Sequence, residues 1–278
     1  MNEQLARYRE ALKGDEPSLH RAAFFGASAD RIALGIAIAY FESTRVRLGG
    51  FPFASLGVTE RGGAHPRAIQ TEAERMEDGA YALRGEKRFI TLGRRCTSIL
   101  VLAKEEKLPD GRFSFGLYRV EAERALVDAE DLPETPFTPE LPHTAIRLSD
   151  LRVPHDARLP GDGYADWVRD FGVVEEHHIL ASILGYRLGL QRVHGLRPNQ
   201  AITDAFRSIL ALDPFHETLE SLELLGHAGT LLLDEITEDG ALKIPEEELA
   251  RYRRDLRILQ LGAGRRMKRL EKLRSLAD

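Results

Sequence analysis

The strongest constraint on the fold is a change in pattern between residues 51 and 160. Turn-forming pairs recur there, namely Gly62-Gly63, Asp78-Gly79 and Asp110-Gly111. Between the turns stand short runs of β-forming residues, at 97–103, 113–120 and 144–154. Several short strands at such spacing favour a β-barrel or β-sandwich. The flanks carry long helical periods instead. We therefore expect three parts: a short helical N-terminal segment 1–50, a β-domain 51–160 and a C-terminal helical domain 161–278.

Local signals predict where the helices begin and end. Ser18 is expected to cap a helix, and a buried helix that follows it is expected to end at Gly49-Gly50. Pro245 and the three glutamates after it suit the first turn of another helix. The tripeptide Gly262-Ala263-Gly264 is expected to break the chain between two helices, because glycine is poor inside a helix and common just past its end.

Composition excludes several classes of partner. The net charge of -5 and the pI near 6.0 provide no overall basic field for nucleic acid or for an anionic membrane. The longest apolar stretch, around 32–40, is too short to span a bilayer, and residues 1–16 lack the apolar core of a signal peptide. Cys96 is the only cysteine, so no internal disulfide can form. We expect a cytoplasmic protein.

Two motifs in the β-domain carry the chemistry. Residues 58–65 read VTERGGAH, and residues 85–93 read GEKRFITLG. These stretches resemble the acyl-CoA dehydrogenase family, in which a V-T-E-P-G-A-G-S-D-like loop precedes G-x-K-x-W-I-T-N-G. The stretches at 145–165, 222–229 and 253–270 are similar to later family motifs. The last resembles R-D-x-x-I-x-x-I-Y-E-G-T-S-x-I-Q-R-x. The resemblance implies an α+β fold of that family, with a reduced C-terminal helical bundle.

The resemblance implies a flavoprotein that dehydrogenates an acyl thioester such as acyl-CoA. A carboxylate would remove the α-proton while FAD accepts the β-hydrogen as hydride. By motif position, Val58 and Thr59 would contact the flavin from the first loop, and Phe89 and Thr91 from the second. His65 stands where a serine often meets phosphates, so the resemblance places it in substrate binding. The family's subunit contacts imply a homo-oligomer.

The family's usual catalytic base is missing. Its glutamate in Y-E-G aligns with Ala263, whose methyl group cannot take a proton. Some members carry the base on an earlier helix, ten residues before the glycine of an L-G pair. Glu175 has this spacing to Gly185, and Glu176 follows it. Adjacent helical residues point about 100° apart, so at most one of the two carboxylates can face a flavin well. A solvated helical face is the alternative, and a metal site with His177 lacks a second ligand pair.

Other departures concern the ADP end of the cofactor and the C-terminus. Glu223 and His227 replace a glutamine and a glycine of the family, which predicts weaker FAD binding and leaves an FMN-sized ligand as an alternative. The basic run that follows Gly264 is expected to form a docked amphipathic helix. Its apolar stripe would contain Met267, Leu270, Leu273 and Leu276. Binding of phosphates or of an acidic partner is the alternative. A protein that binds a thioester or a partner without catalysis is the alternative function.

Overall fold

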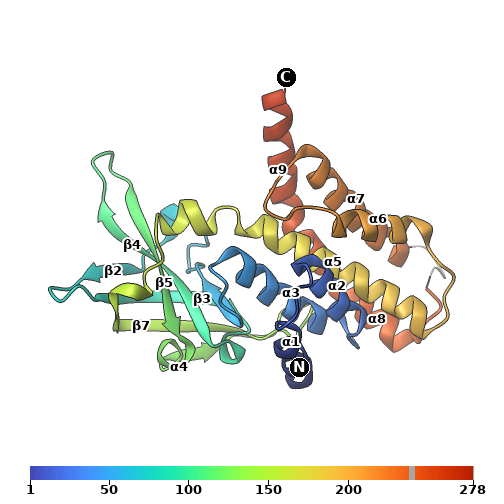
Figure 1. The fold of residues 1–278 in the computed structure, drawn as a ribbon, viewed down its shortest axis with the longest axis horizontal. Coiled ribbons are helices and arrows are strands. Elements are labelled where there is room, and N and C mark those ends of the chain that lie inside the picture. Colours follow the sequence, from blue (N-terminus) through green and yellow to red (C-terminus); the bar gives the residue numbers. More distant parts are fainter. Residues whose placement is uncertain (238–241, 278) are drawn as a thin grey trace. The chain divides into compact units, whose positions relative to one another are not determined.

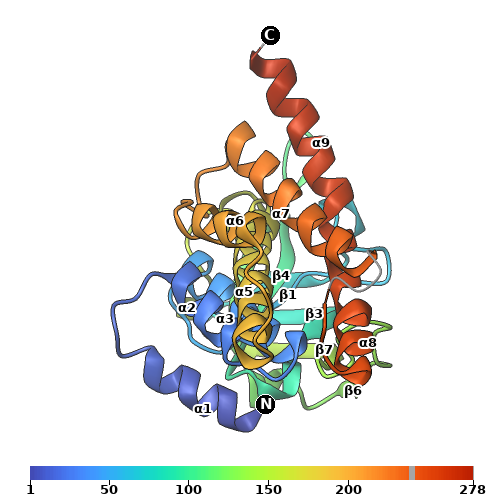
Figure 2. The same cartoon turned by 90° about the vertical axis from the view of Figure 1, so that its right-hand side faces the viewer.

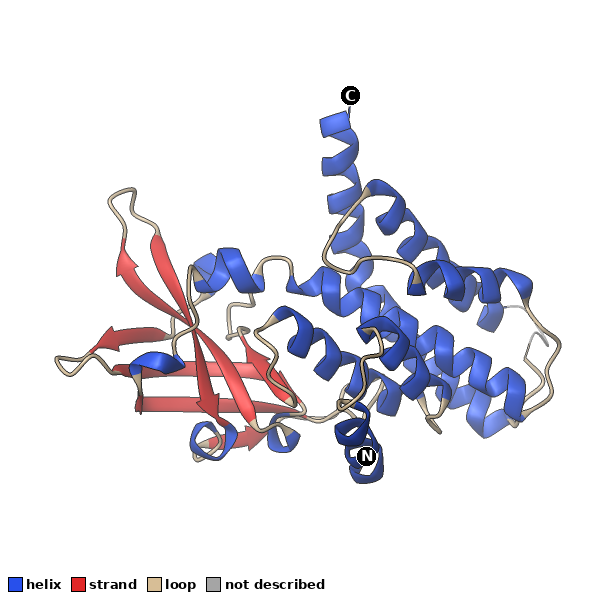
Figure 3. Ribbon diagram, in the orientation of Figure 1, coloured by secondary structure: helices blue, strands red, loops and turns tan. Residues whose placement is uncertain are grey.

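The computed structural model describes residues 1–237 and 242–277. It divides into two units. The helical unit contains residues 1–43, 135–140 and 172–278, and the β-unit contains residues 44–134 and 141–171. Figure 3 shows the strands confined to the β-unit.

The β-unit is built on one mixed sheet of seven strands. The strands are β1 (Ala54–Gly57), β2 (Glu72–Arg75), β3 (Tyr81–Thr91), β4 (Ser98–Lys107), β5 (Phe113–Glu121), β6 (Ala129–Asp131) and β7 (His143–Val153). Their order is β1-β4-β2-β3-β7-β6, and β5 pairs with β4. Figure 1 labels β2, β3, β4, β5 and β7 of this sheet. The three predicted strand regions correspond to β4, β5 and β7, so the strand prediction is confirmed.

Antiparallel pairs dominate the sheet, and each long pair has an irregularity. The pairing of β3 with β7 shifts register between Lys87 and Ile90, and the pairing of β4 with β5 shifts between Lys104 and Lys107. Such bulges bend a strand and turn a side chain out of the alternating pattern. The unit also contains the short helix α4 (Ala122–Ala125) and a helical turn at Gly163–Val168.

The helical unit contains most of the helices. They are α1 (Asn2–Ala11), α2 (Ser18–Ala27), α3 (Ile32–Arg47), α5 (Phe171–Val193), α6 (Gln200–Leu210), α7 (Leu219–Thr237), α8 (Glu246–Asp255) and α9 (Leu259–Ala277). The unit boundary at residue 43 falls inside α3. This helix ends as predicted, because Gly49 and Gly50 both have positive φ, at 89° and 81°.

Glycines allow α5 to approach α2 very closely. A Cβ atom on Gly185 would lie 2.2 Å from the backbone oxygen of Ala23, and one on Gly189 would lie 2.5 Å from that of Ala27. On α2 itself, a Cβ on Gly26 would lie 2.0 Å from the oxygen of Ser182. Figure 2 shows the two helices side by side. No side chain larger than hydrogen fits at these positions at the present helix separation.

A buried ion pair ties α5 to α7. Arg187 donates two hydrogen bonds of 2.5 Å to the carboxylate of Glu235, and both side chains are buried. Breaking such a pair by removing one partner costs about 3–5 kcal/mol, because an uncompensated charge stays buried. The long helix α5 is therefore fixed from two sides, by close backbone contact with α2 and by this pair with α7.

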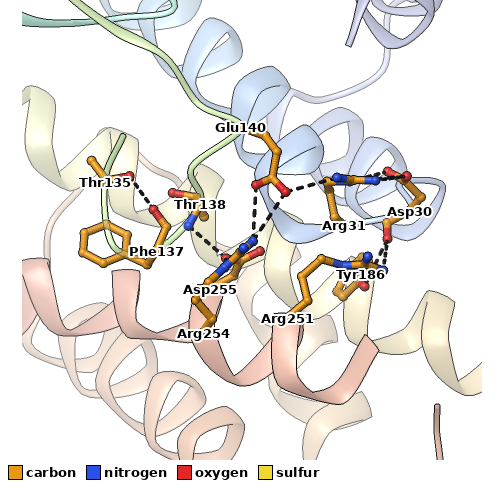
Figure 4. Close-up of polar contacts among 10 residues, drawn as sticks. All are labelled: Asp30, Arg31, Thr135, Phe137, Thr138, Glu140, Tyr186, Arg251, Arg254 and Asp255. Carbon is orange, nitrogen blue, oxygen red and sulfur yellow. Dashed lines mark hydrogen bonds and ion pairs between the residues drawn. The ribbon is translucent and has the colours of Figure 1, made fainter. Parts of the chain in front are cut away.

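A second cluster attaches residues 135–140 to the helices of the same unit (Figure 4). The N–H of Thr138 donates to Oδ1 of Asp255 at 2.8 Å, and Asp255 is fully buried. Glu140 accepts hydrogen bonds from Arg31 and Arg254. Thr138 has a φ of 46°, which is uncommon for a residue with a branched side chain. One backbone hydrogen bond to Asp255 and the side-chain contacts of Glu140 thus attach the segment between β6 and β7 to the helical unit.

Several local predictions are wrong. Ser18 does not cap α2, where Pro17 is the N-cap residue, and its hydroxyl bonds to His178 instead. Gly262-Ala263-Gly264 does not break the chain, because α9 runs from Leu259 through all three residues. The break lies earlier, at the short helical turn Leu256–Ile258 between α8 and α9. Neither glycine of the tripeptide has a positive φ, so both continue the helix.

Candidate functional site

In the helical unit, the two candidate carboxylates lie on α5 beside the first turns of α9. Glu176 forms an ion pair with Arg266 of α9, in which Nη1 of the arginine contacts Oε1 of the glutamate. A Cβ atom on Gly262 would lie 3.0 Å from that same oxygen. Gly262 is therefore needed for close contact with a carboxylate, and not for a helix break. Ala263 is the next residue, so the two positions at which the resemblance would place a base lie on two helices that touch each other.

The environments of the two carboxylates differ. Glu176 is held by Arg266, with Arg265 and Arg269 as further nearby cations. Burial still raises its pKa above the ordinary value, and these cations oppose the rise. Glu175 makes no hydrogen bond within the described residues, and burial raises its pKa to about 7. Arg265 acts to lower the pKa of Glu175, and Glu176 acts to raise it. Glu176 is thus an ion-pair partner of α9, whereas Glu175 has no such partner among the described residues.

The two histidines that follow have structural contacts. His177 and His178 are fully buried, and each donates Nδ1–H to a carbonyl four residues earlier, at 2.8 and 2.7 Å. Nε2 of His178 lies 2.9 Å from the hydroxyl of Ser18, which donates to it. Burial lowers the pKa of His177. Among the described residues, no group of histidine, cysteine or acidic side chains could hold a metal ion.

In the β-unit, the two motif loops lie side by side. The N–H of Arg88 donates to the carbonyl of Thr59 at 2.7 Å, and the hydroxyl of Ser55 donates to the carbonyl of Thr91 at 2.8 Å. Val58 is buried, while Thr59 and Thr91 are partly exposed. The structure therefore brings together the first-loop and second-loop residues that the resemblance assigns to a flavin, apart from the side chain of Val58, which faces the core.

A buried ion pair between Glu60 of the first loop and Lys87 of the second joins the two loops. The sequence interpretation did not single out these two residues. Nζ of Lys87, which is fully buried, lies 2.7 Å from Oε1 of Glu60. Glu60 also accepts hydrogen bonds from the N–H groups of Gln70 and Thr71 and from the hydroxyl of Thr71. Lys87 holds the pKa of Glu60 below its usual range, and burial lowers the pKa of Lys87 to about 8. The sequence signal that could have identified this pair is the glutamate of T-E in the first motif and the lysine of G-x-K in the second.

Phe89 is displayed by a strained backbone. It lies in the bulge of β3 with a φ of 55°, and 53% of its side chain is exposed. Aromatic residues seldom adopt positive φ, and such strain persists only where the surrounding structure enforces it. The ring of His143, at the start of β7, meets it edge-on with centroids 6.1 Å apart. His143 is a further residue of this surface that the sequence interpretation missed.

His65 lies apart from these contacts. Its side chain is exposed, and its Nδ1 accepts the N–H of Arg67, which caps the helical turn Pro66–Ala68. The capping contact alone accounts for a polar residue at this position. Its expected role in substrate binding stays a prediction.

The basic run of α9 is partly paired with acids of the helical unit. Arg269 contacts Glu217 at 3.0 Å and Arg274 contacts Glu223 at 2.7 Å. The expected apolar stripe is only half buried: Leu270 is 7% exposed, whereas Met267 is 52% and Leu276 is 72% exposed. Arg266 and Arg269 of α9 are only partly exposed, and they contact Glu176 and Glu217 of the helical unit. The prediction of a helix is confirmed, but the predicted burial of Met267 and Leu276 is wrong.

Comparison with known proteins agrees with this fold. Residues 55–151 match the family model of the acyl-CoA dehydrogenase middle domain. No curated protein sequence matches the chain. Among solved structures, PigA with FAD and proline has a TM-score of 0.72 at 15% identity, covering 95% of this chain and 84% of PigA.

Two further structures are similar. The prolyl acyl carrier protein oxidase AnaB has a TM-score of 0.68 at 16% identity, covering 96% of this chain and 85% of AnaB. Butyryl-CoA dehydrogenase from Megasphaera elsdenii has a TM-score of 0.60 at 15% identity, covering 87% of this chain and 76% of that enzyme. At these identities the likeness establishes the fold, and the expected α+β fold class is confirmed.

Proposed function

Because the chain is a divergent member of the acyl-CoA dehydrogenase family, we propose that it is a flavin-dependent oxidoreductase that dehydrogenates an acyl thioester between its α and β carbons. The observation that carries the proposal is Glu175, a largely buried carboxylate with a pKa of about 7 and no ion-pair partner among the described residues. A general base works best when its pKa lies near the operating pH.

Residues of the β-unit fit the ring end of a flavin. Thr59 and Thr91 are partly exposed and offer hydroxyl groups, and the exposed ring of Phe89 suits an aromatic wall. When bound, the flavin would accept the β-hydrogen as hydride. The pair Lys87 and Glu60 would hold both loops in place beneath it. We take FAD as the cofactor, because the similar structure of PigA contains FAD, and FMN as the alternative.

The ADP end supports weaker binding. Glu223 is half exposed and engaged with Arg274, and His227 is exposed on α7. A carboxylate near a pyrophosphate adds like charge, which disfavours binding. We expect FAD to bind more weakly than in relatives that keep the amide and the glycine. Titration of the apo-protein with FAD and with FMN measures this, and FAD binding far tighter than FMN would contradict the expectation.

The substrate class follows from the same likeness. We propose an acyl thioester of CoA or of a carrier protein, because AnaB is described as an acyl carrier protein oxidase and the Megasphaera enzyme as a butyryl-CoA dehydrogenase. We also propose a cytoplasmic homo-oligomer. Within residues 1–237 and 242–277, no helix is long and apolar enough to cross a membrane.

The experiment measures reduction of the bound flavin by a panel of acyl thioesters in the absence of oxygen. The loss of flavin absorbance reports the rate. Replacing Glu175 with Gln keeps the shape of the side chain but removes the base. We expect Glu175→Gln to bind flavin and thioester nearly as the wild type does and to lose about two to four orders of magnitude in the rate of reduction. Glu176→Gln is the matched control and should keep most of the rate. Full activity of Glu175→Gln would refute the assignment.

The second candidate function is binding without catalysis, and Ala263 is the observation that favours it. If the wild type reduces flavin with no thioester while Ala263→Glu does, the chain is a relative that lost its base. A protein that takes up neither FAD nor FMN would also support this second function. The contact of α9 with α5 makes Ala263→Glu a meaningful test, because Gly262, the residue before it, lies against the carboxylate of Glu176.

A further inference from the structure

Arg265 reaches from α9 toward the first turn of α5. Its Nη1 lies 2.9 Å from the place that a Cβ atom on Gly172 would occupy. Gly172 precedes Glu175 by three residues, which is about one helical turn, so the two residues lie on adjacent turns of one face. A Cβ atom on residue 172 would therefore crowd the guanidinium in its present position.

The charges near Glu175 come from two helices. Arg265 of α9 and Glu176 of α5 are the charged groups that act on it. Arg266 pairs with Glu176, and Arg269 acts on Glu176 as well. The other two arginines are engaged by acids, at Glu176 and Glu217. Arg265 makes no ion pair with the described residues, so its charge is available to Glu175.

We propose that Arg265 is a positioning residue for Glu175, a cation that α9 places over the first turn of α5 and that Gly172 leaves room for. The proposal rests on the proposed role of Glu175 as the base. In the motif that this region resembles, T and S follow E-G, whereas this chain has two arginines after Ala263-Gly264. The position that lost the carboxylate is thus followed by the cation that acts on the remaining one.

The physical consequence is a balance on one carboxylate. Burial and the neighbouring Glu176 disfavour the charged form of Glu175, and Arg265 favours it. Without Arg265 a larger fraction of the carboxyl groups would be protonated at neutral pH, and fewer could accept a proton. With a closer, fully paired arginine it would be a weak base. Arg265 is exposed and forms no ion pair with Glu175, and its influence keeps the titration near neutrality.

The test is titration of Glu175 itself, followed by carbon NMR on protein labelled at the glutamate carboxyl carbons. The signal is assigned by its absence in Glu175→Gln. We expect a midpoint near 7 in the wild type. Arg265→Gln should raise the midpoint by about one unit, because a nearby cation is lost, and Glu176→Gln should lower it. Gly172→Ala should raise it too, since the new methyl group displaces the guanidinium.

Two further variants make the result specific. Lys268→Gln removes an exposed cation from the same helix that does not act on Glu175, and it should leave the midpoint unchanged. Arg265→Lys keeps a cation and should restore most of the wild-type midpoint. An Arg265→Gln midpoint equal to that of Lys268→Gln would overturn the proposal. If Arg265→Gln shifts the midpoint but Gly172→Ala does not, the role assigned to Gly172 is overturned.

The titration needs neither substrate nor turnover, so its outcome is separate from that of the proposed function. If the midpoints shift as expected but no thioester reduces the flavin, Arg265 acts on Glu175 and the dehydrogenase proposal fails. If a thioester reduces the flavin but the midpoints do not shift, the dehydrogenase proposal stands and the proposed role of Arg265 fails. In an active enzyme, the acid limb of the rate of flavin reduction should move in the same direction as the NMR midpoint for each variant.

Discussion

Replacing Gly185 by alanine tests the close packing that fixes α5. The new Cβ would lie 2.2 Å from the backbone oxygen of Ala23 and 3.0 Å from its carbonyl carbon. The atom it meets is backbone, so no rotamer change can relieve the clash. The two helices must separate locally by about 1 Å, which loosens contacts along the whole seam. Overpacking of this kind costs about 1–3 kcal/mol, and we take the upper end because the clash is severe.

The helical propensity of alanine offsets part of this cost. Alanine is about 1 kcal/mol better than glycine inside a helix. The net expectation for Gly185→Ala is therefore a loss of about 2 kcal/mol in the free energy of unfolding. Gly264→Ala is the matched control, because this glycine also lies inside a helix but a Cβ on it would meet nothing within 4 Å. It should gain about 1 kcal/mol.

The assay is urea unfolding of both variants and the wild type, followed by far-ultraviolet circular dichroism. Because the chain has two units, the curves are fitted to the transition that carries the helical signal. The expected separation between the two variants is about 3 kcal/mol, well above the error of extrapolation. A Gly185→Ala protein as stable as the wild type would show that α2 and α5 can part without cost, and the packing argument would be refuted.

Three other variants test the remaining contacts. Lys87→Met leaves the carboxylate of Glu60 buried without its cation and should cost about 3–5 kcal/mol, whereas exposed Lys107→Met should change stability by less than about 0.5 kcal/mol in the same urea assay. Thr138→Gly removes a side chain from a residue at positive φ and should stabilise the protein by about 1 kcal/mol while keeping the hydrogen bond to Asp255; a loss of stability would contradict the strain. The folded-state pKa of Glu175, about 7, exceeds its ordinary value of 4.5, so the folded state binds more protons within that window and its stability falls as pH rises through it. Glu175→Gln should remove this slope, which amounts to at most about 3 kcal/mol between the two ends, and an unchanged slope would contradict the shift.

The sequence predicted the strands well because their signals are local. Turn pairs and alternating runs lie within a few residues of one another, and β4, β5 and β7 appear where these signals stand. The glycines of 262–264 misled for a related reason. A glycine looks the same in sequence whether it ends a helix or makes room for a neighbour, and only the contact between Gly262 and Glu176 distinguishes the two.

The division of roles between the two carboxylates could not be read locally. Glu175 and Glu176 are adjacent and chemically identical, and the spacing to Gly185 favoured Glu175 only by alignment with the family. Gly185 has its own reason to be glycine, because it packs against Ala23. What separates the carboxylates is Arg266, which lies in a helix ninety residues later and pairs with one of them. Such long-range pairing depends on how α5 and α9 pack, which no local pattern encodes.

The contact between α5 and α9 explains how a base could change its place in this family without a change of fold. Gly262 touches the carboxylate of Glu176, and Ala263 and Glu175 are the residues next to each of these two. Positions 175 and 263 therefore lie on turns of α5 and α9 that are close to each other. Ala263 carries no charge, and the arginines that follow it act on the acids of α5. Glu176 takes one arginine as an ion-pair partner, and Glu175 keeps the weaker influence of the other. The substitution at 263 and the charges at 265 and 266 are, on this argument, parts of one rearrangement.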